Sequence, residues 1–328
     1  MRKDWFQMGV KLTPIIVPDV VDLSALAGKK VVVDGCNLLF KYITKIRKNG
    51  KILYNAQGDP VSHLLGFFYL TINLLERRIR PIYVFDGYPP HEKRQKSPIK
   101  IQRLVRMWRL YQQHEGDRST FYNDPLFLYD KIVADLQELV RLMGCPVVRG
   151  LSEGEAQGAR LVREGKAHAL ISSDQDSLLF GCPLTYYQLL FDANLGKFYD
   201  LQYQLTHLGL SRRQLIDVAI LIGTDYNPGT KGIGPKKALK LIRQYGQLED
   251  IPTLEFPFDI DRVRQLFLKP ATITAAPLYR APNTKYLTYF LKQKGWQSRR
   301  IERGISRLRQ AFRQLRQRQA TILSYIEE

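Results

Sequence analysis

The chain has 328 residues, which corresponds to one large domain or two smaller ones. Hydrophobic residues make up 45% and charged residues 25%, a globular composition that excludes long disorder. The 50 Lys and Arg residues outnumber the 31 Asp and Glu residues, giving a net charge of +19. This excess predicts a polyanionic partner, most often nucleic acid, although a merely soluble basic protein is the alternative.

The cysteines and the apolar runs exclude several classes of protein. Cys36, Cys145 and Cys182 are far apart and form no CxxC pair, which is typical of a reduced, intracellular protein without a zinc site. The most apolar runs extend over about ten residues, too few for a transmembrane helix. The first residues lack the apolar stretch of a signal peptide.

Short apolar runs alternate with helical patterns as far as about residue 209. Strands alternating with helices predict an α/β fold with a mainly parallel central sheet flanked by helices. The expected strands are 30–33, 81–85 and 167–171, with weaker candidates at 145–148 and 185–187. Apolar residues at helical spacing predict helices over 63–77 and 130–143.

Beyond residue 209 the pattern is helical. Ser211 is the expected N-cap of a helix over 212–222, and Pro235 is expected in the first turn of the next helix, which ends at Tyr245. An apolar stripe predicts a late helix over 301–315, whose arginines form a solvated face.

Acidic residues follow the predicted strands, where ligands bind in parallel α/β sheets. We expect seven carboxylates to converge at one end of the sheet. These are Asp34, Asp86, Glu153, Glu155, Asp174, Asp176 and Asp225.

Clustered carboxylates repel one another and require a compensating charge. Asp and Glu without His or Cys favour hard cations such as Mg²⁺ or Mn²⁺, and a pair of such ions is the usual arrangement for phosphodiester hydrolysis. Each acid also has a plainer interpretation. Ser152 and Glu155 have the spacing of a capping box, and a lone Asp after a strand is commonly a turn residue.

Two segments carry features of nucleic-acid binding. Gly232 and Gly234 allow a tight turn between helices, and Lys236 and Lys237 follow, which favours a grip on a DNA backbone over an ordinary helix corner. The segment 88–118 is rich in basic residues with interleaved aromatics. It follows Asp86, which favours a single-strand contact over a solvated connecting helix.

Together these motifs resemble the flap endonucleases, the structure-specific 5′ nucleases of the XPG/PIN-like family, and most closely the archaeal type. The resemblance extends over nearly the whole chain and includes Tyr83-Val-Phe-Asp86-Gly-Tyr-Pro-Pro90 and Gly223-Thr-Asp-Tyr-Asn-Pro-Gly229. It implies a first metal ion held by Asp34, Asp86, Glu153 and Glu155, and a second held by Asp174, Asp176 and Asp225.

The resemblance also implies further site residues. Lys93 matches a catalytic lysine, and Lys100 is expected to help steer the scissile phosphate. A K⁺ ion is expected at a helix-two-turn-helix around the glycine turn. Expected DNA contacts are Phe40, Arg47, Glu153, Gly223, Asp225, Gly232, Gly234, Lys236 and Lys237. Leu70 stands where relatives usually carry a DNA-contacting arginine.

The C-terminal tail resembles the peptide with which flap endonucleases bind the sliding clamp PCNA. The expected contacts are Gln319, Ile322, Tyr325 and Ile326. The alternative is that these residues form the last turn of a packed C-terminal helix.

The sequence therefore predicts a monomeric, two-metal (Mg²⁺ or Mn²⁺) 5′ flap endonuclease with 5′–3′ exonuclease activity, acting on branched DNA in Okazaki fragment processing and repair. The alternatives are a 5′ exonuclease, a Holliday-junction resolvase of the same superfamily, or a non-catalytic nucleic-acid-binding module. We expect it in the cytoplasm or nucleoid of an archaeon, or in the nucleus of a eukaryote. The expected regions are an N-terminal nuclease region (1–107), the arch and connecting helix (108–145), an internal nuclease region (146–230), the helix-two-turn-helix and C-terminal helices (211–318) and the clamp-binding tail (319–328).

Overall fold

A computed structural model describes residues 9–45, 47–48, 51–53, 55, 61–88, 125–252 and 254–326; for residues 40, 43–45, 47–48, 51–52, 125–128 and 316–326 it describes the backbone alone. The strands are β1 (Asp19–Asp22), β2 (Lys30–Asp34), β3 (Arg47–Lys48), β4 (Lys51–Ile52), β5 (Arg80–Phe85), β6 (Val147–Arg149), β7 (Ala169–Ile171), β8 (Leu184–Leu190) and β9 (Leu195–Asp200). The α-helices are α1 (Gly35–Lys45), α2 (Ser62–Glu76), α5 (Pro125–Leu142), α6 (Gly154–Arg163), α7 (Asp176–Leu179), α8 (Leu201–Leu208), α9 (Arg212–Ile222), α10 (Pro235–Tyr245), α11 (Ile260–Leu268), α12 (Thr284–Gln293) and α13 (Ser298–Ile326), and the short 3₁₀ helices are η1 (Leu23–Leu26) and η3 (Leu248–Asp250).

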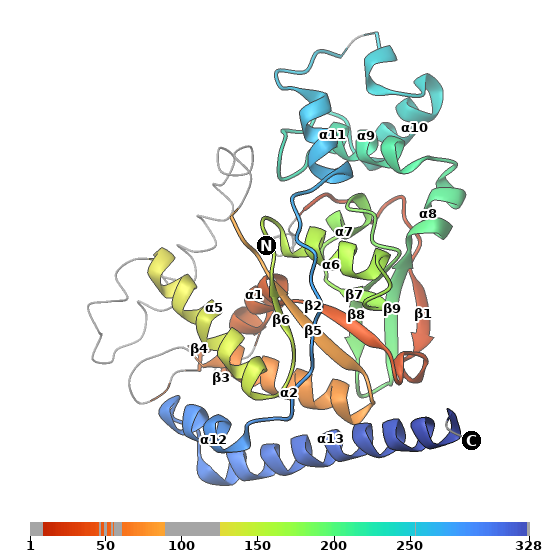
Figure 1. Ribbon diagram of the computed structural model, residues 1–328. Helices are drawn as coiled ribbons and strands as arrows, with labels where there is room; N and C mark the ends of the chain where they lie inside the picture. Colours follow the sequence, from red (N-terminus) through yellow and green to blue (C-terminus); the bar gives the residue numbers. More distant parts are fainter. Residues whose placement is uncertain are drawn as a thin grey trace.

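A seven-stranded sheet forms the centre of the molecule (Figure 1), in the order β1-β9-β8-β7-β2-β5-β6. The five strands from β8 to β6 are parallel, whereas β9 pairs antiparallel with β8 and with β1. The mainly parallel α/β fold predicted from the sequence is confirmed. The antiparallel edge was not predicted, because β1 and β9 carry no continuous apolar run.

Side chains of the central strands alternate between two hydrophobic cores. Val31 and Val33 face a core that includes residues of α2, α5, α12 and α13. Val32 between them faces the other core, which is built with α6, α7 and α9–α11. A period of two is what a strand buried on both faces requires. The parallel arrangement therefore brings the carboxyl ends of β2, β5 and β7 to one edge.

The C-terminal helix α13 is longer than the predicted 301–315. It packs on α2, where Gly304 allows close approach because a β-carbon there would overlap the ring of Phe68. The backbone stays helical to Ile326, through the expected clamp-binding residues 319–326, and no proline interrupts the helix. The other predicted helices and strands are present within a few residues of their expected limits.

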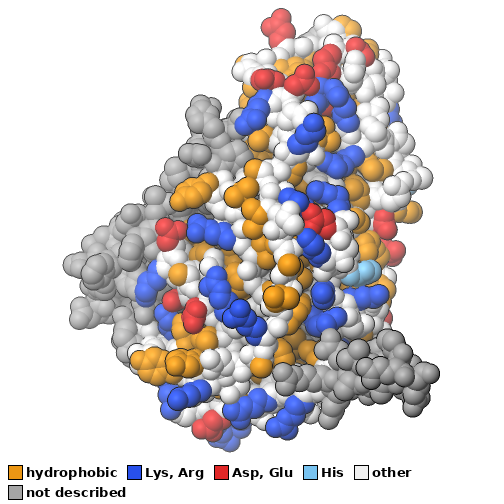
Figure 2. Space-filling view, in the orientation of Figure 1, with side chains coloured by type: hydrophobic (Ala, Val, Ile, Leu, Met, Phe, Trp, Pro, Cys, Tyr) orange, Lys and Arg blue, Asp and Glu red, His pale blue; other side chains and the backbone are white. Residues whose placement is uncertain are grey.

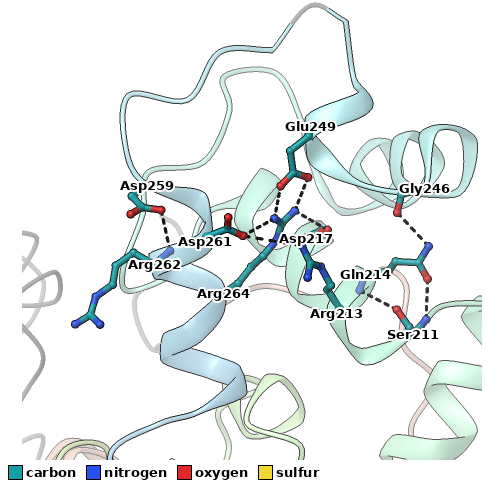
Figure 3. Close-up of polar contacts among 10 residues, drawn as sticks. All are labelled: Ser211, Arg213, Gln214, Asp217, Gly246, Glu249, Asp259, Asp261, Arg262 and Arg264. Carbon is teal, nitrogen blue, oxygen red and sulfur yellow. Dashed lines mark hydrogen bonds and ion pairs between the residues drawn. The ribbon is translucent and has the colours of Figure 1, made fainter.

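A buried arginine joins α11 to α9 (Figure 3). The side chain of Arg264 is 1% exposed and contacts both carboxylate oxygens of Asp217, at 2.6 and 3.0 Å. It also donates to Glu249 and Asp261. Because a buried charge is stable only when paired and hydrogen-bonded, this cluster fixes the register of α11 against α9.

An extended segment, residues 269–283, connects α11 to α12; we call it the strap. It crosses the face of the molecule drawn in Figure 1 without helix or strand. The Gln157 side chain exchanges two hydrogen bonds with the backbone of Ile273, at 2.8 and 2.9 Å. These bonds satisfy strap groups that would otherwise lack a backbone partner. No helix in the described part of the chain is long and apolar enough to cross a membrane.

Candidate active site

All seven of the predicted carboxylates line one small cavity at the carboxyl edge of the sheet. Asp34 ends β2 and Asp86 follows β5 directly. Glu153 and Glu155 lie at the start of α6, and Asp174 and Asp176 follow β7. Asp225 comes from the loop after α9. Five separate segments thus bring their acids to one place, as the strand-end argument predicted.

Hydrogen bonds fix the acids contributed by β2 and β5. The backbone N–H of Asn37 donates to Asp34 Oδ1 at 2.9 Å. The backbone N–H of Gly154 donates to Asp86 Oδ1 at 2.8 Å. The second oxygen of Asp34, Oδ2, accepts from the Ser172 hydroxyl at 3.1 Å. These bonds orient the two acids before any ligand binds.

Ser172 links acids from three elements. Its Oγ lies 2.6 Å from Glu155 Oε1 and 3.1 Å from Asp34 Oδ2, and it accepts from the backbone N–H of Asp174 at 3.2 Å. A hydroxyl carries one proton, so it cannot donate to both carboxylates at once. The arrangement therefore fits a shared proton among the three side chains. The Ser173 hydroxyl also donates to Asn37 Oδ1 at 2.7 Å.

Burial and mutual repulsion act together on this cluster. Burial, and after it the nearby charge of Asp86, raise the pKa of Asp34 to about 7. The pKa of Glu155 is raised well above its ordinary value by burial and then by Asp174, Asp34 and Asp176. Without a cation, the cavity disfavours full ionisation of its acids.

The donor set fits hard cations. All seven side chains offer carboxylate oxygen, the ligand that Mg²⁺ and Mn²⁺ prefer. Among the described residues, no three His, Cys, Asp or Glu side chains are already arranged as a metal-binding group. The donor chemistry thus fits divalent ions.

The N-terminal segment packs against the acids that follow β7. Val10 N–H donates to Asp176 Oδ1 at 2.7 Å, and Leu12 N–H donates to Gln175 Oε1 at 2.6 Å. Gly9 has φ +72°, and a β-carbon there would overlap the carboxylate of Asp174. This segment therefore holds the acids that follow β7.

One interpretation at this site is wrong. Ser152 and Glu155 do not form a capping box, because α6 begins at Gly154 with Glu153 as its N-cap and no side-chain cap bond. The Glu155 carboxylate accepts from Ser172 instead, which turns it into the cavity. The capping box predicted at Ser211 is present, with Gln214 as its partner.

Several residues of the cavity were not singled out from the sequence. Tyr226 donates to Glu153 Oε1 at 3.4 Å. Cys36 lines the cavity, and burial, followed by the charge of Asp86, raises the pKa of its thiol. The signal available was position: Cys36 and Asn37 follow Asp34, and Ser172 directly follows β7.

The glycine turn lies between α9 and α10, as predicted. Gly232 has φ +79°, and a β-carbon on Gly232 or Gly234 would meet no atom within 4 Å. Ile233 between them is 9% exposed and anchors the turn. The turn thus presents open backbone beside the exposed side chains of Lys236 and Lys237.

The remaining expected site residues differ in how much of them the structure describes. A β-carbon on Gly223, at φ +103°, would contact the backbone of Gly229, so a packing requirement explains this glycine too. Leu70 is buried at 5% exposure.

Phe40 lies in α1 and Arg47 in β3, and the structure describes only the backbone of these two residues. Gln319, Ile322, Tyr325 and Ile326 likewise have backbone positions in α13 only. Lys93 and Lys100 lie outside the described residues, as does the predicted arch up to residue 124.

Comparison with known families matches this fold and site. Residues 8–104 match the XPG N-terminal domain and residues 144–225 match the XPG I-region. These ranges contain all seven acids of the cavity. The fold and site are therefore those of an XPG-type nuclease, a phosphodiester hydrolase.

Similar proteins narrow the class. Flap endonuclease 1 of Methanopyrus kandleri is 37% identical, covering 95% of this chain and 98% of its own. That of Staphylothermus marinus is 38% identical, covering 94% and 96%. The solved flap endonuclease-1 of Methanococcus jannaschii superposes with a TM-score of 0.75 at 29% identity, covering 92% of this chain and 98% of its own. The catalytic core of Rad2 in complex with DNA substrate gives 0.70 at 25% identity, covering 90% and 97%.

The chain belongs to the flap endonuclease 1 family. It is a structure-specific DNA nuclease, and nucleases of this family depend on metal ions.

Proposed function

We propose that the carboxylate cavity is where this flap endonuclease cuts DNA, at the junction of a 5′ single-stranded flap with duplex, leaving a 5′-phosphate. The observation that carries the proposal is the convergence of seven acids from five segments on one cavity. Such cutting serves Okazaki fragment processing and DNA repair.

We assign a first divalent cation to Asp34, Asp86, Glu153 and Glu155, and a second to Asp174, Asp176 and Asp225. When bound, a pair of Mg²⁺ or Mn²⁺ ions would supply an activated water and stabilise the leaving oxygen.

The protein's own residues position the ligands. The N–H groups of Asn37 and Gly154 hold one oxygen each of Asp34 and Asp86. The Ser172 hydroxyl is a neutral hydrogen-bond partner of Glu155. Its proton can turn to another acceptor when a cation binds the Glu155 carboxylate. Pre-oriented acids lose less freedom when ions and phosphate bind, and this orientation is what the chain contributes to the chemistry.

Duplex DNA would be gripped away from the cavity. The open backbone at Gly232 and Gly234, with Lys236 and Lys237 at the start of α10, suits a phosphate backbone and, beside it, a K⁺ ion. Phe40, Arg47, Glu153, Gly223 and Asp225 are the proposed contacts nearer the junction. The net charge of +19 supports binding that weakens as salt rises.

Two basic side chains and the C-terminal tail complete the proposal. Lys93 and Lys100 would direct positive charge at the scissile phosphate as the flap passes under the predicted arch. Residues 319–328, through Gln319, Ile322, Tyr325 and Ile326, would bind the sliding clamp PCNA. The enzyme would act as a monomer.

One experiment separates this function from the alternatives. Cleavage of 5′-flap, nicked and four-way DNA is compared in Mg²⁺ and in EDTA. We expect fastest cutting of the flap and none in EDTA. Preferred cutting of nicked or four-way DNA would favour the exonuclease or the junction resolvase, and binding without cutting would favour the non-catalytic module.

A further inference from the structure

A basic hollow lies at the edge of the sheet opposite the carboxylate cavity. Lys30 and Arg80 are the first residues of β2 and β5, whereas Asp34 and Asp86 lie at and just beyond their last residues. The hollow is bounded by the turn after α2, the strap and α13, and its volume is about 610 Å³. That is the size of a typical ligand pocket.

The hollow carries uncompensated positive charge. Lys30, Arg78, Arg80 and Arg280 line it, and no Asp or Glu does. Within the described ranges, none of the four cations forms an ion pair with an acid. Figure 2 shows Lys and Arg side chains gathered along the middle and lower part of this face, with few acids between them. Unpaired charges so close together favour an anionic partner.

Part of this charge is held in place. Arg80 donates to the Gly28 carbonyl at 3.2 Å, and its guanidinium lies 5.9 Å from the centroid of the Tyr279 ring. The Tyr279 hydroxyl in turn donates to the Arg80 carbonyl at 2.8 Å. Arg78 has φ +60°, a left-handed conformation that favours glycine.

The rest of the lining is apolar. Leu278 of the strap is 75% exposed at its rim. Phe312 and Leu315 of α13 contribute half-buried apolar surface. A phosphate backbone gains nothing from such surface, whereas an apolar side chain does. A hollow that is both basic and apolar suits a peptide with acidic residues around an apolar one.

We propose that this hollow binds an acidic peptide segment of a partner protein through an apolar anchor flanked by Asp or Glu. Its place at the amino edge of the sheet leaves the carboxylate cavity and the glycine turn free for DNA. The enzyme can therefore hold the partner and cut its substrate at the same time.

The test measures peptide affinity by fluorescence anisotropy on the full chain. The probe is a short fluorescein-labelled peptide in which Asp and Glu flank a central Leu-Phe pair. Its control replaces that pair by Gly-Gly. We expect the variant Arg78→Glu/Arg280→Glu to bind the Leu-Phe peptide at least about tenfold more weakly than wild type, and the Gly-Gly peptide to bind wild type comparably weakly. A second variant, Leu278→Ser, tests the apolar contribution without changing charge.

The matched control is Arg299→Glu/Arg303→Glu, which makes the same change on exposed α13 residues outside the hollow. This variant should keep peptide affinity, and all variants should retain flap cleavage, which reports that they fold. Equal affinity of the hollow and control variants would overturn the proposal. Loss of labelled oligo(dT) binding with unchanged peptide binding in the Arg78→Glu/Arg280→Glu variant would overturn it in favour of a nucleic-acid surface.

Discussion

The backbone of Gly9 lies directly against the carboxylate of Asp174, close enough that a β-carbon on Gly9 would overlap it. The two residues are far apart in sequence, and the neighbouring bond from Val10 N–H to Asp176 joins the same two segments. The N-terminal segment is thus part of the wall that sets where these acids point.

We expect Gly9→Ala to lower flap cleavage by about tenfold or more, because the added carbon displaces Asp174. Gly28→Ala is a matched control: Gly28 has φ +81°, so it pays a similar backbone cost, but its β-carbon would meet no atom within 4 Å. Initial rates in Mg²⁺ measure the effect. Similar rates for the two variants would show that backbone strain, not displacement of Asp174, matters.

Asp174→Ala should reduce cleavage by at least about a hundredfold, since loss of a metal ligand removes several kcal/mol of charge stabilisation. Flap affinity should stay near that of wild type, because binding energy comes mainly from phosphate contacts. Asp192→Ala removes an exposed acid outside the cavity and serves as the control. Near-normal turnover by Asp174→Ala would contradict the metal assignment.

Lys93→Ala should slow the single-turnover rate by about a hundredfold while duplex affinity changes little, because a charge directed at the scissile phosphate acts in the transition state. Rapid-quench kinetics and equilibrium binding measure the two quantities separately. Lys96→Ala, three residues away, should affect both only slightly. If Lys93→Ala raised the dissociation constant alone, Lys93 would be an ordinary phosphate contact.

Deleting residues 319–328 should leave flap cleavage by the free enzyme intact. The buried and half-buried side chains described near the end of α13, Leu308, Ala311 and Leu315, all precede the deleted residues. The deletion should abolish stimulation by the cognate clamp, and calorimetry with full-length and truncated protein measures the affinity. Equal affinities would exclude the tail as the docking site, and loss of folding would favour a packed helix end.

The Arg264 cluster predicts an acid-dependent stability. Hydrogen bonds from Arg264 lower the pKa of Glu249 to about 2, below its ordinary 4.5. A lowered folded-state pKa stabilises the protein above pH 4.5, and the contribution is lost as the pH falls toward 2. The Glu249 side chain is 43% exposed, so we expect at most about 1 kcal/mol.

The free energy of unfolding, measured with denaturant, should therefore differ between wild type and Glu249→Gln near pH 7. The two values should converge at low pH. Glu255→Gln, outside the cluster, should show no such pH-dependent difference. A constant difference across the pH range would show that Glu249 acts through packing alone.

The location of the site could be predicted from the sequence, whereas the hydrogen bonds within it could not, and the reason is physical. Acids after parallel strands must meet at one sheet edge, so the ends of β2, β5 and β7 located the cavity. The hydroxyl of Ser172 could not be assigned, because its partners come from three elements that only the folded chain brings together. Glu155 is a second example. Its local sequence fits both a capping box and a cavity carboxylate, and only the tertiary contact with Ser172 decides between them.

The extended elements were the hardest to predict. The strap has no periodicity, and it is held by side chains such as Gln157 that lie more than a hundred residues earlier. The antiparallel strands β1 and β9 lack a continuous apolar run: β1 is largely exposed, and β9 is mostly half-buried. Arg264 would likewise be expected at the surface from its sequence, but its side chain is 1% exposed and forms an ion pair with Asp217.

The central position of β2 has a consequence for the chain while it is being synthesised. The strand pairs with β5 and β7 on its two sides, so both of its neighbours are available only after residue 171 has emerged from the ribosome. Asp225 follows Asp34 by 191 residues, which at ordinary translation rates is a delay of about 10 to 40 s. During that time the nascent protein cannot gather its acids, so a prematurely terminated chain carries basic surface but no means of cutting DNA.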